Sequence, residues 1–124
     1  MLMTAYRLSD LGLYDTWVQL HHEDAKRVPE LLSPSVDFVH VDIGNDGRTY
    51  LWAARAFEKL LSPNGMLLLE GGTEERDALD WMSQDGRIPI REALMDLEKD
   101  WHIFTFQAFP GLTMMGRRHG ASIG

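Results

Sequence analysis

The stretch VDFVHVDIGNDGRTYLWAARAFEKLLSPNGMLLLEGG, residues 36–72, decides the fold class of this chain. Its middle part, residues 47–61, carries apolar side chains at spacings of i, i+3, i+4, i+7 and i+11, namely Tyr50, Ala53, Ala54, Phe57 and Leu61. This spacing is typical of a helix that packs one side on a sheet. Strand-like runs flank it. Strand, helix and strand in this order predict two parallel strands joined by a right-handed crossover.

The two flanking runs differ in character. Residues 36–41 (VDFVHV) predict a short buried strand, whereas residues 66–69 (MLLL) are wholly apolar and predict a central strand covered on both faces. Ser-Pro-Asn-Gly at residues 62–65 predicts the end of the helix, because proline cannot continue a helix and Asn-Gly accepts positive φ.

The part upstream of this stretch adds three predicted elements. Residues 4–13 predict a short helix, residues 16–21 (TWVQLH) a strand, and residues 24–32 a helix capped by Asp24. Because proline is tolerated mainly in a first turn, Pro29 implies that the last of these helices begins late.

The part downstream completes the pattern. A helix is predicted from about Thr73 and another over residues 90–99. Two strand-like runs, residues 101–109 and 112–117, flank Pro110-Gly111 and predict an antiparallel hairpin. The chain is therefore predicted to be α/β, a partial doubly wound (Rossmann-like), mainly parallel sheet with a C-terminal antiparallel β-hairpin.

Composition limits the class of protein. The chain has 124 residues, no cysteine and a formal net charge of −7. The length predicts one domain over residues 1–124, and the lack of thiols excludes a disulfide framework or thiolate metal site. The negative charge argues against binding to nucleic acid or an anionic membrane through phosphate neutralisation. No apolar run approaches the roughly 20 residues of a membrane span, and the first residues lack the features of a signal peptide, so a cytoplasmic location is expected.

The residues at the strand ends resemble the second half of a class I S-adenosylmethionine-dependent methyltransferase. HVD at residues 40–42 matches that family's strand ending in His-x-Asp, and LSPNG at residues 61–65 matches its Leu-x-Pro-x-Gly turn. Residues 36–72 are then similar to the fourth and fifth strands. VQLHHEDAKRVPELL looks like the third strand with its helix, and HIFTFQAFPGLTMMGRR looks like the closing hairpin. The resemblance spans about residues 16–118.

Two departures from the family pattern bear on function. The glycine-rich loop after the family's first strand and the acidic residue ending its second strand are absent, since only about fifteen residues precede the candidate third strand. The resemblance thus implies a domain truncated at its N-terminus, with one wall of the cofactor pocket missing. Related cation-dependent O-methyltransferases end the fifth strand with Asp-Asn or Asp-Asp, where this chain has Glu70-Gly71-Gly72.

The resemblance implies S-adenosylmethionine as cofactor and a small molecule as methyl acceptor. Asp42 and Glu70 follow neighbouring strands, where ligands of open α/β sheets bind, and are the predicted catalytic residues. The predicted cofactor contacts are Asp24, Ala25 and Asp42, with Asp24-Ala25 near the adenine. Asp42, Asp46 and Glu70 are the predicted ligands of a divalent cation. Capping of a loop is the alternative role for Asp42.

Other clusters are less suited to chemistry. His21, His22 and Asp24 offer metal-ligating atoms, but adjacent strand residues face opposite ways, so a solvent-facing strand end is favoured. LLLEGGTEERD, residues 67–77, has the outline of a nucleotide loop, but its two glutamates after the glycines would repel a phosphate. It also lacks the G-x-G-x-x-G pattern and the Walker lysine. The four tryptophans are expected in the core or an interface.

Two functions compete. Methyl transfer to an oxygen or nitrogen of a small molecule requires the missing wall to come from a partner chain or an upstream segment. The alternative is a non-catalytic module that acts in oligomerisation or binding. Without the first strand of the family, residues 36–41 would form an exposed edge, which proteins usually cover. We therefore expect a homodimer through that edge, or a rearranged sheet in which residues 16–21 pair beside residues 36–41.

Overall fold

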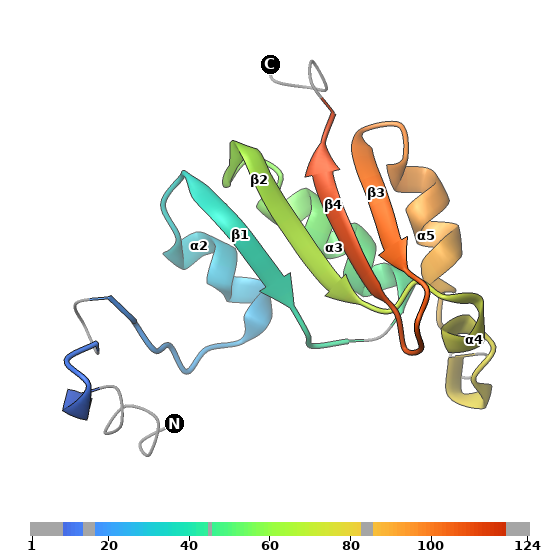
Figure 1. Cartoon of the computed structure of the whole chain (residues 1–124), viewed down its shortest axis with the longest axis horizontal. Coiled ribbons are helices and arrows are strands. Elements are labelled where there is room, and N and C mark those ends of the chain that lie inside the picture. The colour runs from blue at the N-terminus through green and yellow to red at the C-terminus, as the bar shows by residue number, and fades with distance from the viewer. Residues whose placement is uncertain (1–8, 14–16, 45, 83–85, 119–124) are drawn as a thin grey trace. The chain divides into compact units, whose positions relative to one another are not determined.

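The computed structural model describes residues 9–13, 17–44, 46–82 and 86–118 (Figure 1). The chain divides into two compact units, Met1–Leu31 and Leu32–Gly124, and each is described by itself. The prediction of one domain over residues 1–124 stays a prediction. Along the described ranges, no helix is both long enough and apolar enough to cross a membrane.

The amino-terminal unit is built from short turns. The 3₁₀ helix η1 (Ala25–Arg27) leads directly into α2 (Val28–Leu31). Asp24 caps η1, because its carboxylate accepts a hydrogen bond of 2.8 Å from the Lys26 backbone N–H. Pro29 lies in the first turn of α2, so the predicted late start of this helix is confirmed.

The predicted strand over residues 16–21 is wrong for the residues that are described. Residues 17–21 form no strand, and Val18 makes only an isolated bridge. A strand needs a neighbour to bond its backbone, and the four-stranded sheet of this chain does not include these residues. The rearranged pairing beside residues 36–41 is therefore not formed. Residues 4–8 of the helix predicted over residues 4–13 lie outside the described residues, whereas Ser9 and Asp10 are helical.

The second unit confirms the predicted fold class. Its sheet has the order β1-β2-β4-β3, formed by β1 (Val36–Val41), β2 (Leu61–Glu70), β3 (Trp101–Phe106) and β4 (Leu112–Arg117). β1 and β2 are parallel, while β4 runs antiparallel to both β2 and β3 (Figure 1). The crossover between β1 and β2 and the closing hairpin are both where the sequence predicts them.

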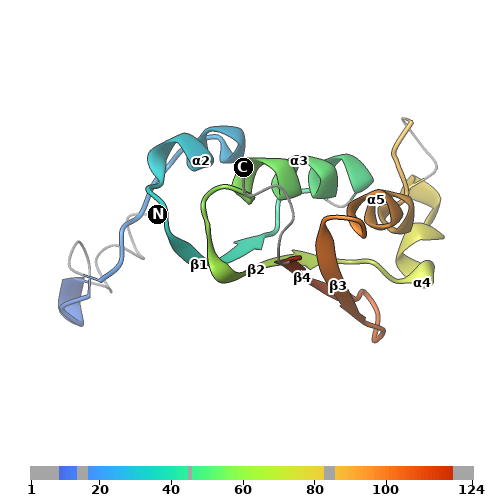
Figure 2. The same ribbon diagram turned by 90° about the horizontal axis from the view of Figure 1, so that it is seen from above.

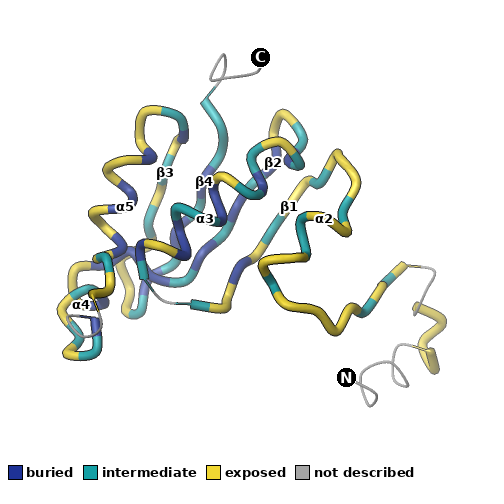
Figure 3. The backbone as a smooth tube through the Cα atoms, turned by 180° about the vertical axis from the view of Figure 1, so that it is seen from behind, coloured by how far each residue is buried: buried dark blue, intermediate teal, exposed yellow. Residues whose placement is uncertain are grey.

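Two helices cover one face of this sheet. α3 (Gly47–Phe57) and α5 (Ile90–Leu97) lie on the same side (Figure 2), and buried residues occur along both helices and the central strands (Figure 3). All five predicted positions are buried in the core, four of them in α3 and Leu61 in β2, and Tyr50 is 0% exposed. Leu67 and Leu69 of β2 point into this core.

The opposite face of the sheet is open. It carries apolar side chains from all four strands, and Phe38 of β1 is 54% and Phe104 of β3 60% exposed. Within this unit no helix packs on the second face (Figure 2), so the described residues of the unit cover residues 66–69 on one face. β1 is an edge strand of this sheet, and Val41 is its one buried residue, so the prediction of a buried strand is wrong.

The end of α3 also differs from the prediction. The helix stops at Phe57, and Leu61 is the first residue of β2, where it pairs with Val36. The next pair joins Phe38 to Met66, so the Ser-Pro-Asn-Gly segment forms a bulge inside the strand. Proline and glycine disfavour regular pairing as well as helix, and here they interrupt a strand.

The region after β2 is a series of short turns and one longer helix. α4 (Glu74–Asp77) and the 3₁₀ helix η2 (Asp80–Met82) stand where one helix from Thr73 was predicted. α5 follows and confirms the predicted second helix, with Ile90, Leu94 and Leu97 on its buried side.

Candidate functional site

The carboxyl ends of β1 and β2 lie side by side at one edge of the sheet. The parallel register pairs Val41 with Leu69, so Asp42 and Glu70 are the next residues of neighbouring strands. Asp42 is exposed, and the Glu70 carboxylate is partly buried. The structure thus brings the two predicted catalytic carboxylates to the same edge, about one strand spacing (~4.8 Å) apart in the backbone.

The backbone beyond Glu70 is fixed by the β3–β4 hairpin. Gly71 has φ +114°, and its N–H donates to the Gly111 carbonyl at 2.8 Å. Thr113 Oγ1 donates to the Gly71 carbonyl, also at 2.8 Å. A side chain on Gly71 would lie 2.8 Å from Ile90 Cδ1, so only glycine turns the chain at this point.

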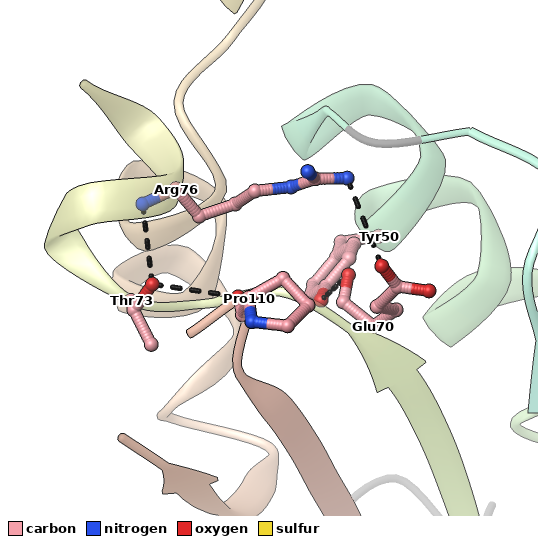
Figure 4. Close-up of polar contacts among 5 residues, drawn as sticks. All are labelled: Tyr50, Glu70, Thr73, Arg76 and Pro110. Atoms are coloured by element: carbon pink, nitrogen blue, oxygen red, sulfur yellow. Dashed lines mark hydrogen bonds and ion pairs between the residues drawn. The ribbon is translucent and has the colours of Figure 1, made fainter. Parts of the chain in front are cut away.

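Five residues around this turn form what we call the strand-end cluster: Tyr50, Glu70, Thr73, Arg76 and Pro110 (Figure 4). Thr73 caps α4, since its Oγ1 accepts from the Arg76 backbone N–H at 3.2 Å. The same hydroxyl lies 3.4 Å from the Pro110 carbonyl, to which it donates. This cap sends the Arg76 side chain back across the turn toward Glu70 (Figure 4).

Tyr50 supports the cluster from α3. Its hydroxyl donates a hydrogen bond of 2.6 Å to the backbone carbonyl of Glu70. Burial raises the pKa of the Tyr50 phenol well above its ordinary value, because the charged form would lose its hydration. The phenol therefore stays protonated and acts as a permanent hydrogen-bond donor to the end of β2.

Arg76 is a buried cation with few partners. The residue is 8% exposed, and its Nη2 lies 3.9 Å from Glu70 Oε1, which is an ion-pair distance but too long for a hydrogen bond. Its Nε is wholly buried and has no hydrogen-bond partner among the described residues. The guanidinium carbon lies 4.9 Å from the centre of the Trp81 ring, a cation–π contact that Arg87 makes at the same distance.

The predicted metal site is not formed by the residues described. No group of three or more His, Asp or Glu side chains gathers there as metal ligands. Asp46 instead caps α3, where its Oδ1 accepts from the backbone N–H and the hydroxyl of Thr49, each at 3.2 Å. Glu70 faces Arg76. The structure therefore gives no support to the prediction that Asp42, Asp46 and Glu70 bind one divalent cation, because two of the three carboxylates have other partners.

The remaining predicted residues belong to the amino-terminal unit. Asp24 and Ala25 form the start of η1, and His21 and His22 are exposed outside any helix or strand. Because the two units are described separately, the contact of Asp24 and Ala25 with a cofactor stays a prediction.

A second feature lies at the other end of the strands. An apolar groove of about 500 Å³ opens on the uncovered face, over Gly116 of β4. Met66, Phe104 and Met114 line it, together with His102 at its rim. Met66 pairs with Gly116, whereas Glu70 pairs with Leu112, so the groove and the strand-end cluster occupy opposite ends of the sheet.

The arrangement at the strand end is suited to orienting a polar ligand. Glu70 offers carboxylate oxygens held near a guanidinium, and the exposed Asp42 offers a second pair of acceptors next to it. Carboxylates in such positions bind hydroxyl groups or accept their protons.

Sequence reasoning missed Arg76 and the polar role of Tyr50. The position of Tyr50 matched the apolar stripe of α3, so its hydroxyl was not considered. Arg76 lies among acidic residues in the sequence, and its ion pair with Glu70 forms only because the chain turns at Gly71.

Comparison with known proteins places the fold. No family model matches the chain, and no curated protein matches it in sequence. Among solved structures, the crystal structure of the SAH-bound methyltransferase PaMTH1 from Podospora anserina is similar, with a TM-score of 0.63 and 18% sequence identity. The match covers 94% of this chain and 56% of that chain, so this chain spans little more than half of that structure's length. The chain therefore has a methyltransferase-like α/β fold.

Proposed function

We propose that this chain takes part in S-adenosylmethionine-dependent methyl transfer to a small molecule, at the carboxyl edge of β1 and β2. One observation carries the proposal: Asp42 and Glu70 stand side by side at the sheet edge where ligands of open α/β sheets bind. The fold shared with a methyltransferase solved with SAH supports the choice of cofactor. A cytoplasmic location is part of the same proposal.

The residues present fit one side of such a cofactor. Asp42 is exposed at the strand end, where its carboxylate can accept hydrogen bonds from hydroxyl groups. β1 is the edge of the sheet, and in this proposal a partner chain or an upstream segment supplies the other side. The bound cofactor would supply the methyl group. Glu70 would orient the acceptor and take up the proton of its nucleophilic hydroxyl, and Arg76 would keep the carboxylate in place.

Calorimetric titration with S-adenosylhomocysteine tests this proposal. We expect saturable binding to the wild-type chain and binding about tenfold weaker in Asp42→Asn, the loss of one charged hydrogen bond. Glu70→Gln should retain binding but lose methyl transfer. Asp96→Asn, on the exposed side of α5, is the matched control and should bind as wild type does. The absence of heat with millimolar ligand would leave the chain without the proposed cofactor.

A second candidate is a non-catalytic module that forms a homodimer through β1. It is favoured by the open edge of β1 and by Phe38, a large apolar side chain exposed on that edge. A second copy would bond the free backbone groups of β1 by extending the sheet. The partner would then also stand beside Asp42, so this candidate and the first are compatible.

Light scattering at tens of micromolar protein tests the dimer. The wild type should have twice the mass of one chain, and Phe38→Lys should shift it to the monomer by placing a charge on the paired edge. Met95→Lys, at a large apolar residue exposed on α5, should remain dimeric. A wild-type monomer in this range would contradict the dimer.

A further inference from the structure

The guanidinium of Arg76 has more hydrogen-bonding capacity than its surroundings use. A guanidinium carries five N–H donors in a planar fork. Within the described part of the chain, the nearest carboxylate oxygen, Glu70 Oε1, is 3.9 Å from Nη2, and Nε is buried without a partner. Buried polar groups in folded proteins nearly always have partners, so this group requires an explanation.

Two acidic residues of α4, the helix that carries Arg76, have other partners. Both oxygens of Asp77 accept backbone N–H groups at the start of α5, from Ile90 and Arg91, each at 2.9 Å. Glu74 pairs with the Arg91 side chain at 3.5 Å. The ion pair of Arg76 with Glu70, at 3.9 Å, is too long for a hydrogen bond.

A second guanidinium adds to the positive charge. Arg87 lies 4.9 Å from the centre of the Trp81 ring, as Arg76 does, so the two cations are held by one aromatic side chain. Glu70 supplies one negative charge against these two positive charges. The strand-end cluster itself holds one cation, Arg76, and one anion, Glu70, and a second guanidinium, that of Arg87, contacts the same tryptophan ring as Arg76.

We infer that Arg76 binds an oxyanion, a carboxylate or phosphate group carried by the methyl acceptor, and that Arg76 is a specificity-determining residue of the proposed site. The planar fork of a guanidinium matches two oxygens of such a group. The accessible end of the side chain, which is 10% exposed, faces Glu70 (Figure 4). An acceptor held there by its anionic group would present a neighbouring hydroxyl to the Glu70 carboxylate. This inference rests on the proposed function for the identity of the ligand, but not for the anion site itself.

The experiment uses the full chain and three small probes: benzoate, inorganic phosphate and neutral benzyl alcohol. Arginine Nε–H signals are followed by ¹H–¹⁵N NMR, and the signal of Arg76 is identified by its loss in Arg76→Lys. We expect benzoate or phosphate to shift this signal saturably, with little effect from benzyl alcohol. A response to benzoate alone identifies a carboxylate, and a response to phosphate alone identifies a phosphoryl group.

Two variants provide the comparison. Arg76→Lys keeps the charge but removes the fork, and should weaken binding of the effective anion by about tenfold or more. Arg91→Lys is the control, because Arg91 is an exposed arginine that pairs with Glu74, and it should bind as wild type does. If Arg76→Lys does not fold, the Arg76 signal is assigned by triple-resonance NMR of the wild-type chain, and the wild-type titration remains decisive. Three results would overturn the inference. They are equal shifts with benzyl alcohol and benzoate, no shift with either anion, and unchanged affinity in a folded Arg76→Lys.

Adding S-adenosylhomocysteine to the same samples separates this inference from the proposed function. Binding of the anion without binding of S-adenosylhomocysteine would support the anion site and remove methyl transfer as its purpose. Binding of S-adenosylhomocysteine without an effect of either anion would support the proposed function and overturn the role of Arg76.

Discussion

Tyr50 links the hydrophobic core to the carboxyl end of β2, because its ring packs in the core and its hydroxyl bonds to Glu70. Its ring is buried under α3, and its hydroxyl holds the carbonyl of Glu70 at 2.6 Å. Tyr50→Phe keeps the ring and removes the donor, so the free energy of unfolding should fall by about 1–2 kcal/mol. Urea denaturation followed by circular dichroism measures the change. An unchanged midpoint would show that the hydrogen bond contributes nothing to stability.

The same side chain predicts a dependence of stability on pH. Burial raises the pKa of the folded phenol above the value of about 10 in the unfolded chain. Above pH 10 the unfolded state releases this proton and the folded state keeps it, so stability falls as pH rises. The wild type should lose more stability than Tyr50→Phe between pH 9 and pH 11. Parallel losses in the two proteins would contradict the role of Tyr50.

Gly72 is required at its position for two reasons. Its φ is +106°, a region that other residues rarely adopt, and a side chain would overlap Thr113 Oγ1. Gly72→Ala should therefore destabilise the fold by about 2–4 kcal/mol, since strain and overlap add. Gly86 is the matched control, because it also has a positive φ (+62°) but nothing within 4 Å of an added Cβ. Thermal unfolding of both variants should show the larger loss in Gly72→Ala.

At the scale of elements, the start of α5 depends on a residue far back in the sequence. Pro89 precedes the helix and has no side-chain acceptor, so the backbone N–H groups of Ile90 and Arg91 bond to Asp77 of α4 instead. Asp77→Ala should cost about 1 kcal/mol or more, the usual loss for a helix cap. Asp96→Ala, on the exposed side of the same helix, should be close to neutral in the same denaturation experiment.

The elements that periodicity alone defines were predictable from the sequence. β1 has the predicted bounds, and the buried positions of α3 and α5 follow their 3.6-residue spacing. The end of α3 was not predictable in this way, because it depends on tertiary contacts. Arg117 of β4 donates to the carbonyls of Glu58, Leu61 and Ser62 at 2.9 to 3.0 Å, and so holds the chain where it enters β2.

The candidate site was predictable only in part, for the same reason. The strand ends place Asp42 and Glu70 together whenever two parallel strands pair in register. The metal site was predicted from the positions of carboxylates in the sequence, which do not show the hydrogen-bond and ion-pair partners of those carboxylates. Asp46 accepts a hydrogen bond as the N-cap of α3. Glu70 forms an ion pair with Arg76, and the turn at Gly71 brings the two residues together. Local pattern predicts which residues reach an edge, but not which polar groups they meet there.

For the whole molecule, the division into two units has a thermodynamic consequence. The entire sheet, both helices that cover it and the hydrophobic core lie within residues 32–118. A unit with its own core can fold alone. A chain of residues 32–124 should therefore unfold cooperatively on heating. Its midpoint temperature should lie within about 5 °C of that of the full chain, which corresponds to a difference of ~1 kcal/mol in the free energy of unfolding. Loss of the cooperative transition would show that residues 1–31 are part of the folding unit.

The same truncation separates stability from binding. If Asp24 and Ala25 contact the adenine of the cofactor, residues 32–124 should fold yet bind S-adenosylhomocysteine at least about tenfold more weakly than the full chain, since charged hydrogen bonds are lost. Asp24→Ala in the full chain should reproduce most of that loss, because its effect on η1 is confined to one local cap. Equal affinity in all three proteins would assign the cofactor contacts to the sheet edge alone. Asp42 would then remain as the predicted contact.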